Sequence, residues 1–181
     1  GNHTGGHRRE EGNQDGEGNA AQFTWPCGVA VDRVGNHLFI YGNVIVADAG
    51  NNAGNGYDCI RKISPQDLVS TLAGNNGEDW LSASGYHDGQ GTAARFNSPA
   101  GVAVDGDGNV VVADMNNHCI RKISPQGLVT TLAGTGAEGC RDGEGTVAEL
   151  SEPWGVAVDG EGNVVVADAG NSRIPKISPQ R

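Results

Sequence analysis

Short apolar runs rich in valine and isoleucine recur along the chain, separated by bends of glycine, aspartate, asparagine and proline. In the middle of the chain these runs lie at 102–105, 110–113, 119–124 and 128–132. Their length and β-branched content predict strands. The bends between them are too short for a crossover helix, so neighbouring strands should be antiparallel. The run VVVA at 110–113 is apolar on both faces, which indicates a strand with a sheet packed on each side.

This set of runs occurs three times. The sequence GVAVD stands at 28–32, 101–105 and 155–159, and each copy continues into VVVAD or VIVAD and then KISPQ. The first copy carries extra residues at 37–43 and 53–58 and is followed by a longer linker than the second. Insertions confined to connections leave the strands intact.

The repeats define the domain organisation. We expect a polar N-terminal segment at 1–15, and then three units at about 16–74, 88–134 and 142–181 with linkers between them.

Composition and charge agree with a strand-rich fold and exclude some partners. The chain has 30 glycines and 7 prolines but only 5% aromatic residues, which favours many short strands and turns. Its net charge is −10, so it repels phosphate backbones, and nucleic acid is not an expected partner. The sequence has no apolar run long enough to span a membrane and no signal-type segment at its start. We expect a processed product or a part of a longer protein.

One copy carries a family resemblance. The segment from Pro99 to Ile123 reads P-x-G-V-A-V-D-x-x-G-N-V-V-V-A-D-x-x-N-x-x-I-R-K-I, and the other copies follow it closely. This pattern resembles the NHL repeat over about 16–180. The resemblance implies an all-β fold made of β-propeller blades, each with four antiparallel strands. With about three blades, we expect a partial or open propeller that exposes unpaired edges and apolar sheet faces at its ends. Pro175 replaces the arginine of the pattern and should weaken strand pairing there.

The four cysteines have no C-x-x-C spacing, which argues against a zinc knuckle or a redox pair. Cys119 begins a strand and Cys140 follows the next one, so a hairpin should bring them to one end of the blade as a disulfide. Cys27 and Cys59 form the second candidate pair, because both lie where strands of the first unit begin. Free buried thiols are the alternative.

The sequon Asn2-His3-Thr4 is a candidate N-glycosylation site. It favours an extracellular or cell-surface location.

A weak metal candidate lies in the bend after the first strand of the second copy. Asp105, Asp107 and Asn109 place carboxylate and amide oxygens at alternate positions, as calcium loops do. The first copy has Val34 where the second has Asp107, and no glutamate follows at EF-hand spacing. We therefore interpret the bend as a hairpin whose polar side chains bond to their own backbone.

Other charged residues recur once per unit. Asp48, Asp114 and Asp168 end the second strand of each copy and are expected to accept N–H bonds from the turn that follows. Arg61 and Arg121 are interpreted as solvated charges on an outer strand, with pairing to neighbouring acids as the alternative.

Cofactor and catalytic motifs are weak. The recurring GxGxxA bend, as at 143–148, is interpreted as a turn between blades with Phe23 or Phe96 tucked between sheets. Peptidyl-amidoglycolate lyases, an enzyme class with NHL repeats, hold zinc with histidines. The five histidines here occupy unequal positions in the repeats, so no ligand set carries over: His3, His7, His37, His87 and His118. We predict no cofactor and no catalytic residues.

The resemblance implies a binding role without naming the partner. We expect a non-catalytic module, secreted or exposed at the cell surface, that assembles with its own copies as a filament or ring, packs on further blades of a longer chain, or binds protein or glycan. The alternative is a fragment of a larger NHL enzyme similar to a peptidyl-amidoglycolate lyase. RNA binding, as in some NHL ubiquitin ligases, needs a basic face that a charge of −10 disfavours.

Overall fold

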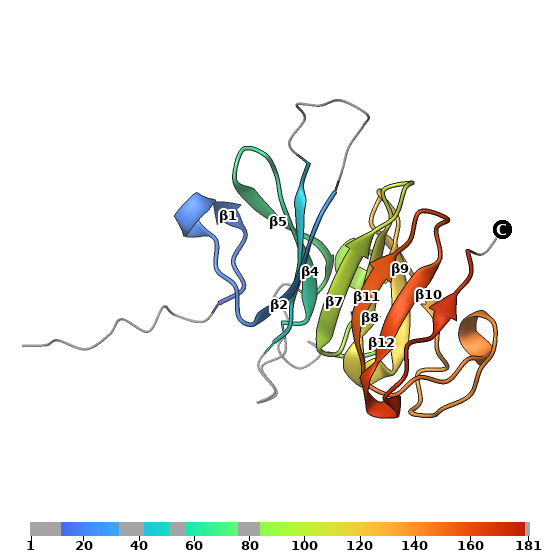
Figure 1. Cartoon of the computed structure of the whole chain (residues 1–181). Helices are drawn as coiled ribbons and strands as arrows, with labels where there is room; N and C mark the ends of the chain where they lie inside the picture. The colour runs from blue at the N-terminus through green and yellow to red at the C-terminus, as the bar shows by residue number, and fades with distance from the viewer. Residues whose placement is uncertain (1–11, 33–41, 51–56, 76–83, 180–181) are drawn as a thin grey trace, which may run out of the picture.

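The chain forms three antiparallel sheets in the computed structural model, which describes residues 12–32, 42–50, 57–75 and 84–179 (Figure 1). In spatial order the first sheet contains β1 (Gly16–Glu17), β5 (Leu68–Gly74), β4 (Cys59–Ile63), β3 (Val44–Asp48) and β2 (Pro26–Val31). The second contains β6 (Gly89–Gln90), β10 (Leu128–Ala133), β9 (Cys119–Ile123), β8 (Val110–Asp114) and β7 (Pro99–Val104). The third contains β11 (Pro153–Val158), β12 (Val164–Asp168) and β13 (Lys176–Ile177). The sheets are the blades of a partial, open propeller.

The four strands predicted for each unit are present in the first two blades, and each of these blades gains a fifth. The extra strand, β1 or β6, comes from the bend before the unit and has two residues. It pairs with the outer strand of its own blade, as Gly89 does with Val129. An outer edge presents unpaired backbone groups, so the returning bend satisfies some of them.

Pro175 shortens the third blade, as predicted. The strand β13 has two residues, whereas β4 and β9 at the same place in the other blades have five. Proline has no N–H to donate to a ladder, so regular pairing begins only after it.

The blades meet most closely at their inner strands. β2 packs beside β7, and β7 packs beside β11. A side chain on Gly101 would place its Cβ 2.7 Å from the Trp154 carbonyl oxygen, and one on Gly28 would collide with the Ala100 carbonyl oxygen. Glycine therefore allows neighbouring backbones to approach one another here.

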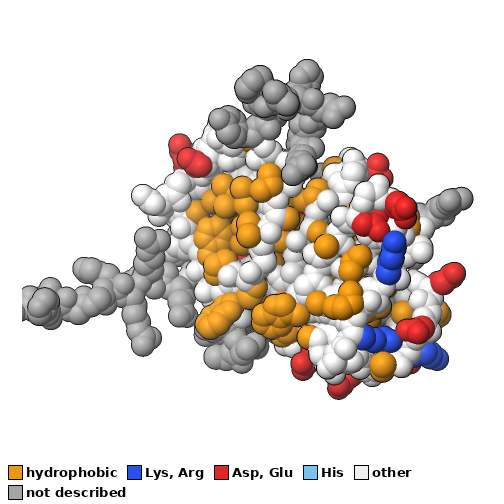
Figure 2. Space-filling model, viewed as in Figure 1, with side chains coloured by type: hydrophobic (Ala, Val, Ile, Leu, Met, Phe, Trp, Pro, Cys, Tyr) orange, Lys and Arg blue, Asp and Glu red, His pale blue; other side chains and the backbone are white. Residues whose placement is uncertain are grey.

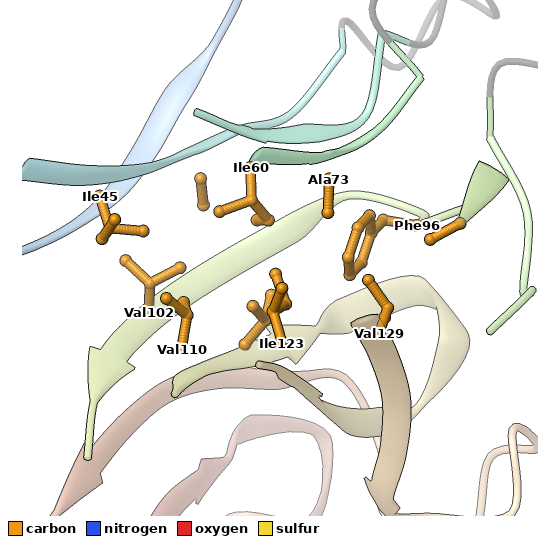
Figure 3. Packing of buried hydrophobic residues seen from close by; sticks show 11 residues of the cluster. Ile45, Ile60, Ala73, Phe96, Val102, Val110, Ile123 and Val129 are labelled. Atoms are coloured by element: carbon orange, nitrogen blue, oxygen red, sulfur yellow. The ribbon is translucent and has the colours of Figure 1, made fainter. Parts of the chain in front are cut away.

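Two apolar cores lie between the blades. The first joins Ile45, Ile60 and Ala73 of blade one to Val102 and other residues of blade two, with Phe96 buried at its end as expected (Figure 3). The second is built in the same way between blades two and three. Each core belongs to an interface between sheets, so blades stabilise one another in sequence.

Candidate interaction surface

Arg121 is the largest buried charged residue of blade two, and none of its side chain is exposed. Its guanidinium donates to Asp114 at 2.8 Å and to Asp88 at 2.5 Å. The rings of Tyr86 and Phe96 lie 5.1 and 5.2 Å from its Cζ atom. The arginine thus ties the second strand of the blade to the segment that carries β6, and its charge is paired with two carboxylates.

The interpretation of Arg61 and Arg121 as solvated charges was wrong, and their pairing with acids, the alternative, is observed. Arg61 is also fully buried and donates to Asp48 at 3.3 Å and to Asp15 at 2.7 Å. The strand that carries each arginine is the middle one of five, not an outer one. It is covered by the preceding bend and its aromatic residue, neither of which strand periodicity reveals.

Blade three has a similar set of arginine–aspartate pairs, although Pro175 stands where the other blades have Arg61 and Arg121. Arg173, two residues before Pro175, donates to Asp168 at 2.6 Å and to Asp142 at 2.8 Å. The same two acidic positions are used as in the other blades. Arg173 was not identified from the sequence, because it stands where the other copies have cysteine.

The aspartates that end the second strands accept N–H bonds from a different segment than predicted. Asp114 accepts from the Asn97 N–H at 2.8 Å, and Asp168 accepts from the Ser151 N–H at 2.7 Å. Asp48 accepts from the Thr24 and Trp25 N–H groups, both at 3.0 Å. These donors precede the first strand of the blade. The aspartates therefore hold the chain where it enters the inner strand.

Asp114 is expected to titrate well above an ordinary aspartate. Burial raises its pKa to about 6, although Arg121, Asn117 and the Asn97 N–H act in the opposite direction. The folded pKa exceeds the unfolded value of about 4, so the stability that Asp114 contributes below about pH 4 is lost as the pH rises through 6. Carboxyl ¹³C chemical shifts should give a midpoint near 6 for Asp114. A midpoint below 4 would contradict this assignment.

The weak metal candidates hold a turn together. Asp105 Oδ1 accepts N–H bonds from Asp107 at 3.0 Å and from Asn109 at 2.8 Å, and the Asn109 amide donates back to the Asp105 carboxylate. Asp159 and Asn163 repeat these bonds in blade three. The carboxylate oxygens of Asp105 are thus engaged within the hairpin.

Asn36 follows Asp32 at the spacing that separates Asn109 from Asp105, but in blade one it is Asn43 that bonds to the aspartate of the turn. The side-chain amide of Asn43 donates to the Asp32 carboxylate at 3.2 Å, and the backbone carbonyl of Asn43 accepts the Asp32 N–H. The insertion therefore falls inside the hairpin, between the aspartate and its asparagine. Val34 and Asn36 lie outside the described residues.

Neither predicted disulfide is present, and all four cysteines are free. Pro26, beside Cys27, and Cys59 both lie opposite Asp48. Cys27 and Cys59 are thus two strand spacings apart, about 10 Å, beyond disulfide reach. Cys119 is buried in blade two, whereas Cys140 is exposed in a segment whose neighbours pair with Glu149 and Leu150 before blade three.

The cysteines should differ in reactivity. Cys59 and Cys119 are buried, and burial raises the pKa of Cys59 to about 12 and also raises the pKa of Cys119. A charged maleimide should therefore label Cys27 and Cys140 in the native chain, and all four residues in denaturant. Mass spectrometry of the labelled peptides reads this out. Native labelling of Cys59, or disulfide-linked peptides without reductant, would contradict it.

Within 12–32, 42–50, 57–75 and 84–179, no three His, Cys, Asp or Glu side chains are grouped to hold a metal. Over the same residues, no helix is long and apolar enough to cross a membrane. His118 Nδ1 accepts the Glu152 N–H at 3.2 Å. Asn2, His3, His7 and His37 lie outside the described residues.

An open apolar cavity of about 300 Å³ lies at one end of the inner strands. Trp25 and Trp154 flank it and are 64% and 55% exposed. The remaining lining residues are Cys27, Ala49, Gly50, Ser98, Ala100 and Met115. Its lining includes no charged side chain among the described residues.

Apolar side chains are also exposed on the two outermost sheets. We call Val29 and Val31 the leading face of blade one; they are 68% and 56% exposed. We call Ala157, Val165, Ala167 and Ile174 the trailing face of blade three, where Ile174 is 68% exposed. Figure 2 shows hydrophobic side chains gathered over the first sheet. No further sheet covers either face among the described residues.

Comparisons with known proteins agree on the repeat. The family model described as NHL repeat matches residues 96–123 and 150–176. NHL repeat-containing protein 2 of Bos taurus is 32% identical over 90% of this chain and 22% of its own length. Protein SUPPRESSOR OF QUENCHING 1, chloroplastic, of Arabidopsis thaliana is 43% identical over 50% of this chain and 9% of its own length. This chain therefore spans a small part of either relative.

A solved structure supports the fold. A protein of unknown function from Bacteroides thetaiotaomicron aligns with a TM-score of 0.61 and 28% identity, over 75% of this chain and 32% of that one.

Proposed function

Because the chain is an NHL-repeat protein, we propose that it is a non-catalytic interaction module, secreted or at the cell surface, that associates with protein through apolar surfaces of its blades. The observation that carries this proposal is where its exposed apolar residues lie. Val29, Val31 and Ile174 are more than half exposed at positions whose counterparts are largely covered inside the stack. Large apolar surfaces in contact with water favour association with another surface.

The charged residues support the same proposal. The buried arginines and the aspartates that end the second strands are bonded to one another and to backbone groups. These charged groups hold each blade together, so their buried positions are explained by a structural role. Protein is favoured over glycan because sugar hydroxyls need polar partners and the exposed faces are apolar.

The proposal is tested against the enzyme alternative on the native protein. We expect no stoichiometric zinc by metal analysis and no turnover of a peptidyl-amidoglycolate substrate, with or without added zinc. A known lyase assayed in parallel is the control. Bound zinc at one equivalent together with turnover would refute the non-catalytic role and favour a fragment of an NHL enzyme.

A further inference from the structure

The contact between blades is repeated within the chain. Blade one presents Ala30, Ile45, Ala47 and Ile60 to blade two. Blade two presents Val111, Ala113 and Ile120, from the matching positions, to blade three. Ile60 and Ile120 are both 0% exposed. One chain thus contains two examples of a single docking geometry.

The leading face of blade one and the trailing face of blade three correspond to the two sides of this internal contact, but no other blade packs on either of them among the described residues. Ile174 of blade three matches Ile60 and Ile120 in position, but it is 68% exposed. At the other end, Val29 of blade one matches Val102, which is 7% exposed inside the stack. A chain that carries both halves is complementary to another copy of itself.

Gly155 supplies an independent indication. The matching glycines Gly28 and Gly101 each lie against the carbonyl of the next inner strand and have no room for a Cβ. A Cβ on Gly155 would meet only Ala167 Cβ at 3.5 Å, an ordinary contact. Blade three therefore has the glycine that allows close approach, but no strand among the described residues lies against it.

We propose that a second copy of this chain docks its leading face on the trailing face of the first, head to tail, and repeats the internal contact between blades. Gly155 of one copy then lies beside Cys27 and Gly28 of the next. The inference rests on the proposed function and names its partner. Continuity with the two internal interfaces selects this partner, because its face already has the required side chains. A head-to-tail contact closes into a ring or continues as a filament according to its rotation.

The net charge sets the conditions for observing this association. Each copy carries a charge of −10, so copies repel one another at low ionic strength. Salt screens this repulsion, and association through apolar faces should strengthen as salt is raised.

The test is one substitution placed at three sites of the 181-residue chain. Gly155→Ala fits the single chain but should clash across the proposed contact, weakening association at least tenfold in sedimentation velocity over a concentration series at physiological salt. Gly160→Ala is the matched control, because a Cβ there meets nothing within 4 Å. Gly101→Ala places the same clash inside the chain and should lower its thermal stability.

The outcomes separate the proposal from the proposed function. Association of the unaltered chain, as a dimer or as longer species, together with its loss in Gly155→Ala and retention in Gly160→Ala, supports the head-to-tail contact. An unaltered chain that stays monomeric at all concentrations overturns it, as does association that Gly155→Ala leaves intact. Either result leaves the zinc and turnover test of the non-catalytic role unaffected.

Discussion

Replacing Arg121 with methionine should lower the free energy of unfolding by about 3–5 kcal/mol at neutral pH. The substitution keeps an apolar stem of similar length but removes the guanidinium that pairs with Asp114 and Asp88. Asp114 is fully buried, so its charge would be left without a cation in an apolar interior. Chemical denaturation is the measurement, in a Gly155→Ala background so that association does not contribute.

The control is the next residue along the strand. Lys122 is 36% exposed and lies 3.7 Å from Asp105, so Lys122→Met should cost less than about 1 kcal/mol. The cost of Arg121→Met should be smaller at pH 5 than at pH 7.5, because Asp114 can then bind a proton. Equal costs for the two substitutions would mean that the buried pair does not hold the blade.

Shortening Ile120 and Ile174 to alanine should give opposite results. Ile120 is fully buried between blades two and three, and Ile120→Ala should cost about 2–5 kcal/mol through lost burial and the cavity left behind. Ile174 stands at the matching position of blade three but is 68% exposed. Ile174→Ala should change the stability of the single chain by less than about 0.5 kcal/mol.

The same Gly155→Ala background separates folding from association in this comparison. In an otherwise unaltered chain, Ile174→Ala should instead weaken association, because the side chain lies on the trailing face. A large loss of stability from Ile174→Ala in the single chain would show that this face is already covered, and would contradict its assignment as a docking surface.

The strands and their repetition were predictable because they depend on local sequence. Runs such as 110–113 are short, apolar and bounded by bends, so their length, type and direction follow from the residues themselves. The shortened strand after Pro175 followed from its missing N–H. The strands β1 and β6 were not predicted, since a two-residue strand has no periodicity and forms only because an outer edge lies beside it.

The buried ion pairs were harder to predict. The alternation of polar and apolar residues along a strand does not reveal that Arg121 is covered by a preceding bend and two aromatic rings. The sequence nevertheless contains a signal, because an aspartate precedes the GxGxxA bend of every unit, at Asp15, Asp88 and Asp142. The prediction of a Cys27–Cys59 disulfide was wrong because it considered only that both residues lie at the same end of the sheet. It did not take into account that β3 lies between the strands that carry them.

The exposed residues of the leading and trailing faces can be identified by comparing equivalent positions in the three repeats. Three repeats predict that the two outermost sheets each have an uncovered face. Which side chains are exposed there depends on the side of the sheet to which each side chain points. Comparison of Val29 with Val102, and of Ile174 with Ile120, identifies them. Their burial inside the stack shows how the exposed copies can be covered.

Amide hydrogen exchange at increasing protein concentration tests the head-to-tail association most directly. We predict that exchange slows in β2 and in β12–β13 over the same concentration range, while β8 and β9 do not change, and that Gly155→Ala abolishes the effect. Exchange that is independent of concentration, or that slows at only one of the two faces, would contradict the account.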